Sequence, residues 1–131
     1  MSTTGWILGL TLWLACGLWP SLARAQCSGL AAPPIAFAWE TLTISSTAKS
    51  LTKTIYQPPG TVPILAIVTL EGGNIRYLET GTPTATSGHV LSVPVTTSFN
   101  ICGLDSITHF QAIRVTTDVT ATVTYYKIKT P

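Results

Sequence analysis

The side chains in this sequence that could do chemistry are two histidines, an Asp-Ser pair and two cysteines. Asp105, Ser106 and His109 bring the three residue types of a nucleophilic triad into one short segment. Known triads assemble from separated elements, which orient the base toward the nucleophile, so this spacing argues against catalysis. The sequence therefore predicts a protein that is not an enzyme and has no catalytic residue.

The same side-chain types could also bind zinc, through His89, His109, Cys27 and Cys102. Zinc sites commonly use short Cys-x-x-Cys or His-x-x-x-His spacings, and neither spacing occurs in this sequence. Four scattered residues would have to converge to hold the ion. We therefore expect neither a metal nor another cofactor.

A secretory leader is predicted at residues 1–25. Its apolar run, residues 6–19, is shorter than the roughly 20 residues that cross a bilayer. Ala23 and Ala25 supply the small-x-small pattern that signal peptidase reads, so cleavage is expected between Ala25 and Gln26. No Lys or Arg precedes the run and Arg24 follows it, opposite to the usual charge bias, so an uncleaved anchor or a misassigned start stays open. Membrane contact is expected only through this segment, if it is not cleaved.

Removal of the leader leaves Cys27 and Cys102 as an even pair of cysteines. In an oxidising compartment such a pair forms a disulfide. A bridge over so long a loop would stabilise the domain by roughly 4 kcal/mol in the chain-entropy treatment. Two unrelated thiols are the alternative, since a new N-terminus is often mobile.

Charged residues are scarce, at 9% of the chain against roughly 25% in average globular domains. Without Arg24, the seven cations become six, and they face five anions with no basic run or stripe. That pattern gives little affinity for a phosphate backbone, so no nucleic-acid partner is expected. Threonines between the apolar residues predict a hydroxyl-covered surface, which suits a protein built into an assembly and equally an ordinary soluble β-domain.

Alternation of polar and apolar residues predicts an all-β fold, a small antiparallel β-sandwich or barrel of about seven strands. A Pro- and Ala-rich linker is expected at residues 26–38 and the β-domain at residues 39–131. Runs that alternate or are rich in β-formers predict the strands, at residues 40–45, 63–71, 74–79, 90–95, 98–102, 110–115 and 119–126.

Two tight turns predict two hairpins. Residues 71–74, Glu-Gly-Gly-Asn, join one strand pair, and residues 116–118 join the last pair. In the final strand the apolar residues are expected to face the core and the threonines to face water: Val119, Ala121, Val123 and Tyr125 point inward. A single helical turn at residues 104–109 is expected to begin at a cap formed by Asp105 or Ser106.

Arg76 and Arg114 lie in the middle of otherwise apolar strands. They could form a paired anchor for a partner's carboxylate, or each could be structural, with its head bonded to Glu71, Glu79 or a loop carbonyl. We favour the structural interpretation, because a mid-strand arginine generally needs a partner within its domain. His89 is expected to bond within its own loop and His109 to be a half-buried residue at a strand entry.

Four blocks of sequence, at residues 68–77, 81–89, 107–114 and 122–126, resemble a family of small β-sandwich proteins encoded among the structural genes of tailed bacteriophages. The motif positions in this chain are Glu71, Gly72, Gly73, Ile75, Arg76, Tyr77, Pro83, Thr84, Gly88, His89, Phe110, Arg114 and Tyr125. The resemblance implies a non-enzymatic virion protein of the capsid surface, neck, tail or fibre, with other virion proteins or copies of itself as partners.

The chain departs from that family in two places. Leu78-Glu79-Thr80 stands where an Arg or Asp commonly flanks the turn. The leader is the larger departure, because virion proteins assemble in the cytoplasm and need no signal. An exported cell-envelope binding or adhesion module, periplasmic or secreted, is therefore the alternative to the virion location.

Overall fold

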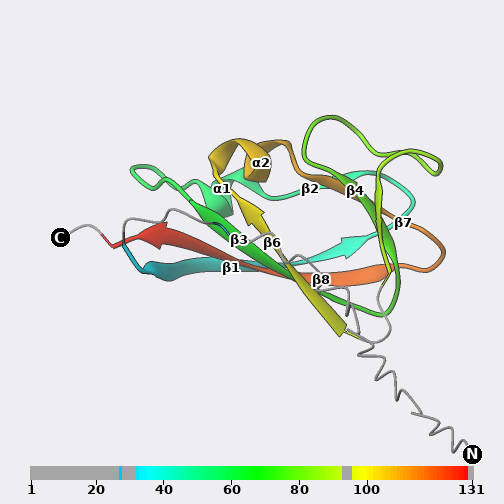
Figure 1. The fold of residues 1–131 in the computed structure, drawn as a ribbon, viewed down its shortest axis with the longest axis horizontal. Helices are drawn as coiled ribbons and strands as arrows, with labels where there is room; N and C mark the ends of the chain where they lie inside the picture. Colours follow the sequence, from blue (N-terminus) through cyan, green and yellow to red (C-terminus); the bar gives the residue numbers. More distant parts are fainter. Residues whose placement is uncertain (1–26, 28–31, 93–95, 130–131) are drawn as a thin grey trace, which may run out of the picture.

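The seven strands expected from the sequence and one short additional strand form two four-stranded sheets, which confirms the small all-β sandwich (Figure 1). The computed structural model describes residues 27, 32–92 and 96–129. The predicted leader and its cleavage site at Ala23, Ala25 and Gln26 lie outside the described residues. Among those residues no helix is both long and apolar enough to cross a membrane.

Eight strands and two short helices make up this part of the chain. Sheet A contains, in spatial order, β1 (Pro34–Ile44), β8 (Val119–Ile128), β3 (Leu65–Glu71) and β6 (Thr96–Cys102). Sheet B contains β2 (Lys49–Ser50), β7 (Gln111–Arg114), β4 (Ile75–Leu78) and β5 (His89–Leu91). The helices are α1 (Lys53–Tyr56) and α2 (Leu104–His109). Every described pairing between strands is antiparallel.

Both predicted hairpins are wrong. β3 and β4 belong to different sheets, so the Gly72-Gly73 turn carries the chain from sheet A to sheet B. β7 and β8 are likewise separated, because β7 pairs with β4 while β8 lies between β1 and β3. A tight turn can join two strands of one sheet or two strands of facing sheets. In both cases the same alternate residues of each strand are buried, so the sequence pattern does not distinguish the two arrangements. Among the eight described strands, β4 and β5 are the one consecutive pair whose members lie side by side in a sheet.

The predicted linker boundary also needs correction. Strand β1 begins at Pro34, so residues 34–38 belong to the domain rather than to a linker that ends at Ala38. The far end of β8 supplies their partners, with Pro34 opposite Ile128. Phe37 lies at a register shift and packs against the core, its ring centroid 6.5 Å from that of Tyr125. Pairing and burial thus override the Pro- and Ala-rich composition.

The helical turn after β6 forms as the six-residue helix α2, but its predicted cap does not. Gly103 occupies the N-cap position with φ +86°, and neither Asp105 nor Ser106 stands there. A positive φ favours glycine, which is the reason the chain turns into the helix at this residue. His109 ends α2 in an exposed position, so its assignment as a half-buried strand residue is wrong.

The core lies between the two sheets, and the side of β8 that faces it is the side predicted from the sequence. The inward positions of that strand are buried, as expected: Val119, Ala121, Val123 and Tyr125. Leu70 of β3 lies beside them in sheet A, as the cross-strand partner of Ala121, and Ile75 of β4 belongs to sheet B; neither has any exposed surface. Burying a full aliphatic side chain stabilises a fold by roughly 1.5–3 kcal/mol, so this layer is the main source of stability.

Candidate functional site

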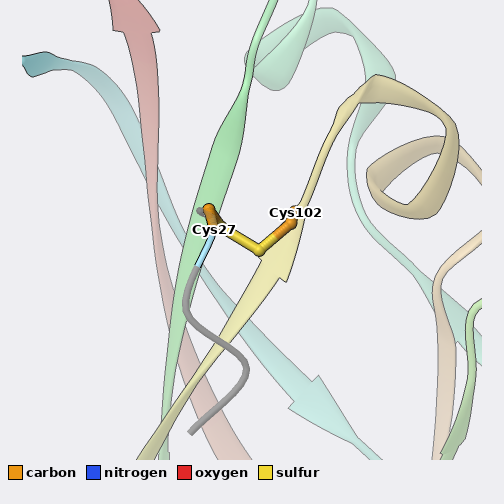
Figure 2. The surroundings of a disulfide bond; sticks show 2 residues. All are labelled: Cys27 and Cys102. Carbon is orange, nitrogen blue, oxygen red and sulfur yellow. A yellow bond between two sulfur atoms is a disulfide. The ribbon is translucent and has the colours of Figure 1, made fainter. Parts of the chain in front are cut away.

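Cys27 and Cys102 are joined in a disulfide, with their Cα atoms 5.5 Å apart. Figure 2 shows the bridge where β6 ends, with Cys27 beside β3. Cys102 is the cross-strand partner of Leu65, which faces the outside of sheet A and is nevertheless buried. The bridge therefore fixes Cys27 to the outer side of sheet A.

The disulfide removes the zinc hypothesis, because neither sulfur is available as a ligand. The described part of the chain has no cluster of three or more His, Cys, Asp or Glu that could hold a metal ion. His89 lies on β5, where its ring centroid is 5.6 Å from that of Tyr77. The two histidines thus belong to separate elements, β5 and α2.

The residues of the triad-like segment come together only in part. His109 Nδ1 lies 3.3 Å from Asp105 Oδ1 and 3.0 Å from the Asp105 carbonyl oxygen, as residues four apart on a helix can. The side chains are 54% and 88% exposed, so water surrounds the pair. A shallow groove near α1, lined by Lys53, Gln57 and residues 58–62, includes none of the three. The Asp105-His109 pair is therefore a solvent-exposed contact on the protein surface.

The two mid-strand arginines do not form a paired anchor. Arg114 shares a face of sheet B with its partner Ile75, whereas Arg76 shares the opposite face with Ile113. Arg76 donates a long hydrogen bond of 3.5 Å to the carbonyl oxygen of Gly88, which is the loop carbonyl expected for a structural arginine. Its Nε is buried without a hydrogen-bond partner among the described residues.

Arg114 has a different partner from the three that were expected. Its guanidinium lies 2.5 Å from Asp118 Oδ1, between the end of β7 and the start of β8. Both side chains are more than a third exposed, and water weakens such a pair to roughly 0–1 kcal/mol. Its role is local, within the connection between the two sheets.

Most residues of sheet B that carry the family resemblance lie in one cluster of aromatic rings and loop residues. The Tyr77 ring centroid is 5.8 Å from that of Phe110 and 5.3 Å from that of Phe99, which lies on sheet A. Burial, and secondarily the nearby Glu79 carboxyl, raise the pKa of the Tyr77 hydroxyl. Pro83 is buried under the loop that follows, where Thr84 bonds to Ser87 with a hydroxyl distance of 2.8 Å. These residues hold the two sheets and the loop together.

Gly88 closes that loop, and we expect Gly88→Ala to destabilise the protein more than Gly81→Ala. Both residues have positive φ, +113° and +103°, which costs a side-chain-bearing residue about 1 kcal/mol or more. A Cβ at Gly88 would also lie 3.1 Å from the Tyr77 carbonyl oxygen, whereas one at Gly81 has no atom within 4 Å. Urea unfolding should show a further loss of about 1 kcal/mol for Gly88→Ala. Equal losses would contradict the tight packing seen at Gly88.

The outer face of sheet A is an ordered array of hydroxyl side chains. Direct cross-strand partners share a face, so the pairing registers place the residues in rows across the sheet. One row is Trp39, Thr124, Ile67 and Asn100; the next is Thr41, Thr122, Thr69 and Ser98; a third contains Thr43, Thr120 and Glu71. We name these residues the hydroxyl face. Within it, Thr69 and Ser98 bond to each other at 2.8 Å.

Trp39 is the exceptional residue of the hydroxyl face. It lies on β1, an edge strand of sheet A, and 69% of its surface is exposed. From Trp39 onward the strand alternates strictly, with Glu40, Leu42 and Ile44 buried on the other side. The row beyond Trp39 contains Tyr126 and Cys102, so the disulfide borders one end of the face.

Sequence reasoning missed this face as a site. The signal was present in residues 39–43, Trp-Glu-Thr-Leu-Thr, where the period of two puts Trp39 in phase with the polar threonines rather than with the apolar residues. A tryptophan on the polar side of an amphipathic strand is an exposed tryptophan. The rows themselves needed the pairing of β8 between β1 and β3, which no local pattern indicates.

Comparison of the chain with protein-family models, with curated proteins and with solved structures found no match.

Proposed function

We propose that the protein is a non-enzymatic, exported binding module of the cell envelope, periplasmic or secreted, which uses the hydroxyl face as its binding surface. The observation that carries this proposal is the disulfide between Cys27 and Cys102. Disulfides form and persist in oxidising compartments and are rare in the cytosol. Cys27 follows directly after the residue at which the predicted leader would be cleaved, so export and oxidation fit together.

The position of the bridge supports the same proposal. It joins residues 75 apart in sequence and borders the hydroxyl face, on which the exposed Trp39 lies. A binding surface on a rigid sheet loses little entropy when a ligand docks, because its backbone is already ordered. A disulfide-bonded sandwich therefore suits recognition in an oxidising compartment.

A virion structural protein is the second candidate, and it is favoured by contacts among the blocks that carry the phage resemblance. The Tyr77 ring lies in tilted contact with those of Phe110 and His89, and Arg76 donates a hydrogen bond to the Gly88 carbonyl oxygen, so positions from three of the four blocks meet. Such contacts are expected of a motif that specifies one fold. Association with other virion proteins, or with copies of itself through the edges of β1 or β6, stays a prediction.

Intact mass of the native protein, taken from purified particles and from the exported fraction, separates the two candidates. We expect a chain that begins at Gln26, or its cyclised form lacking one ammonia, and that is two hydrogens lighter than the reduced protein. Treatment with reductant should restore those two hydrogens. A reduced chain found only in particles would contradict export and favour the virion candidate.

A further inference from the structure

We propose that the hydroxyl face binds an uncharged carbohydrate, with Trp39 as the platform beneath one sugar ring and the neighbouring threonine hydroxyls bonded to the sugar hydroxyls. The inference rests on the proposed function, since it names the ligand class of the same surface.

The exposure of Trp39 points to a ligand that contacts its ring. Tryptophan is usually highly buried, because its large ring is costly to leave in water. Here 69% of the residue is exposed, on a strand whose other face is well packed. A rigid ring offers a broad flat contact for little loss of side-chain entropy, and the C–H face of a pyranose is an apolar surface of similar kind.

The chemistry of the surrounding rows matches that of a sugar. Each threonine or serine hydroxyl donates one hydrogen bond and accepts two, and an uncharged sugar offers the same mixture in return. The two rows that begin with Trp39 and Thr41 contain no ionisable side chain, and Glu71 lies at the far end of the third row. An uncharged ligand rich in hydroxyl groups matches such a surface.

The geometry of the sheet sets the spacing between Trp39 and the hydroxyl groups. Thr124 lies directly across from Trp39, and Thr41 follows two residues along the same strand, on the same face. Strands in a sheet are about 4.8 Å apart, and residues two apart on one strand are about 6.8 Å apart. Hydroxyl groups therefore stand beside the tryptophan ring in two directions, at distances on the scale of one sugar unit.

Other classes of partner fit this surface less well. A stable protein interface needs an apolar centre, and apart from Trp39 the three rows contain one apolar residue, the half-buried Ile67. A nucleic acid or an anionic membrane needs clustered cations, and these rows contain no Lys or Arg. The shortage of charge thus favours a sugar over the alternatives.

The test is a glycan microarray that contains both neutral and acidic glycans, probed with the exported, oxidised protein. Positive neutral glycans are then titrated while tryptophan fluorescence is followed. Of the four tryptophans, Trp6, Trp13 and Trp19 lie in the predicted leader, so in the cleaved chain the signal reports on Trp39 alone. We expect binding to neutral glycans with a change in that fluorescence. Binding to acidic glycans only, or to none, would overturn the inference.

Variants locate the site. Trp39→Ala is expected to weaken binding by about tenfold or more, Trp39→Tyr to retain part of it, and Thr122→Val to weaken it by roughly threefold. Val90→Ala, an exposed apolar residue on sheet B, and Thr108→Val, an exposed threonine on α2, are the matched controls and should bind as the unmodified protein does. Unchanged affinity in Trp39→Ala would overturn the inference. Urea unfolding of each variant verifies that its fold is intact.

Failure of this inference is distinguishable from failure of the proposed function. A protein that is exported and oxidised, and that binds cells through Trp39 after periodate has destroyed their sugars, keeps the proposed function and loses the carbohydrate. A protein that is reduced and confined to particles loses the proposed function, whatever it binds.

Discussion

Replacing both Cys27 and Cys102 with serine should lower the free energy of unfolding by about 4.5 kcal/mol, the largest of the effects that we predict. The bridge closes a loop of 75 residues, and the chain-entropy relation gives this value for a loop of that length at 25 °C. Much of the effect arises in the unfolded chain, which gains conformations when the cross-link is removed. Urea unfolding of the variant and of the oxidised protein measures the difference.

Two comparisons make that experiment specific. The unmodified protein in reductant should lose about the same stability as the double variant, and the double variant should be insensitive to reductant. The variant should also show a larger dependence of the unfolding free energy on urea, because its unfolded chain exposes more surface. Equal stability with and without the bridge would contradict a structural role for the disulfide and weaken the case for export.

Tyr125→Phe should lower the free energy of unfolding by about 2–3 kcal/mol at neutral pH, the second largest effect. The Tyr125 hydroxyl donates a hydrogen bond to Glu40 Oε1 inside the sandwich, and the Thr52 backbone N–H donates to the same oxygen at 3.0 Å. Glu40 is only 6% exposed and is the buried acidic side chain of the described core. Without the hydroxyl, the carboxyl group stays in the core with one donor fewer.

The same pair makes stability depend on alkaline pH. Burial, and then the hydrogen bond to Glu40, raise the pKa of Tyr125 far above its ordinary value of 10.0. The folded protein therefore keeps the phenol proton at a pH where the unfolded chain releases it. This contribution is fully present below pH 10.0 and is lost progressively as the pH rises above that value. Tyr77, whose pKa is also raised, adds to the effect in the same direction.

Urea unfolding between pH 7 and pH 11.5 tests both statements about Tyr125. Tyr125→Phe should begin less stable and should lose less stability above pH 10 than the unmodified protein. Tyr126→Phe is the matched control, because that neighbouring tyrosine lies on the outer side of the strand and is half-buried, and its effect should stay within about 0.5 kcal/mol. Equal effects of the two variants would show that the buried hydrogen bond contributes little.

The two expected results bear on the proposed function through β8. Its inner side holds Tyr125 and the core, and its outer side holds Thr120, Thr122 and Thr124, the central column of the hydroxyl face. Because the inner side chains of β8 are packed in the core, the strand cannot shift, and its outer side chains keep fixed positions relative to the neighbouring strands. The core hydrogen bond and the disulfide are therefore conditions for an ordered binding surface as well as for stability.

The family resemblance and the predicted leader suggested two locations for the protein, and the structure does not support the two equally. The disulfide favours export, whereas the contacts among the motif residues support the family resemblance and, through it, the virion location. The compartment therefore has to be measured on the native protein. The hydroxyl face is present in both cases, so the carbohydrate experiment is informative whichever location is found.

The sequence by itself determined the fold class, most strand positions and the inward phase of β8. These follow from local physics, because an alternation of apolar and polar residues commits each side chain to one face of a pleated strand. It also offered Cys27 and Cys102 as a pair. It did not determine the start of β1, since Pro34 and Ile35 have no local signal that outweighs the proline-rich composition around them.

Only the tertiary structure decided which strands are neighbours. The turns at Gly72-Gly73 and at residues 115–118 look like hairpin turns, yet each joins one sheet to the other, because pairing depends on contacts between residues far apart in the chain. The buried Glu40 was hidden for the same reason, since its partner Tyr125 lies 85 residues away. The hydroxyl face is the clearest case: its threonines come from three strands, and only the order β1-β8-β3-β6 brings them together beside Trp39.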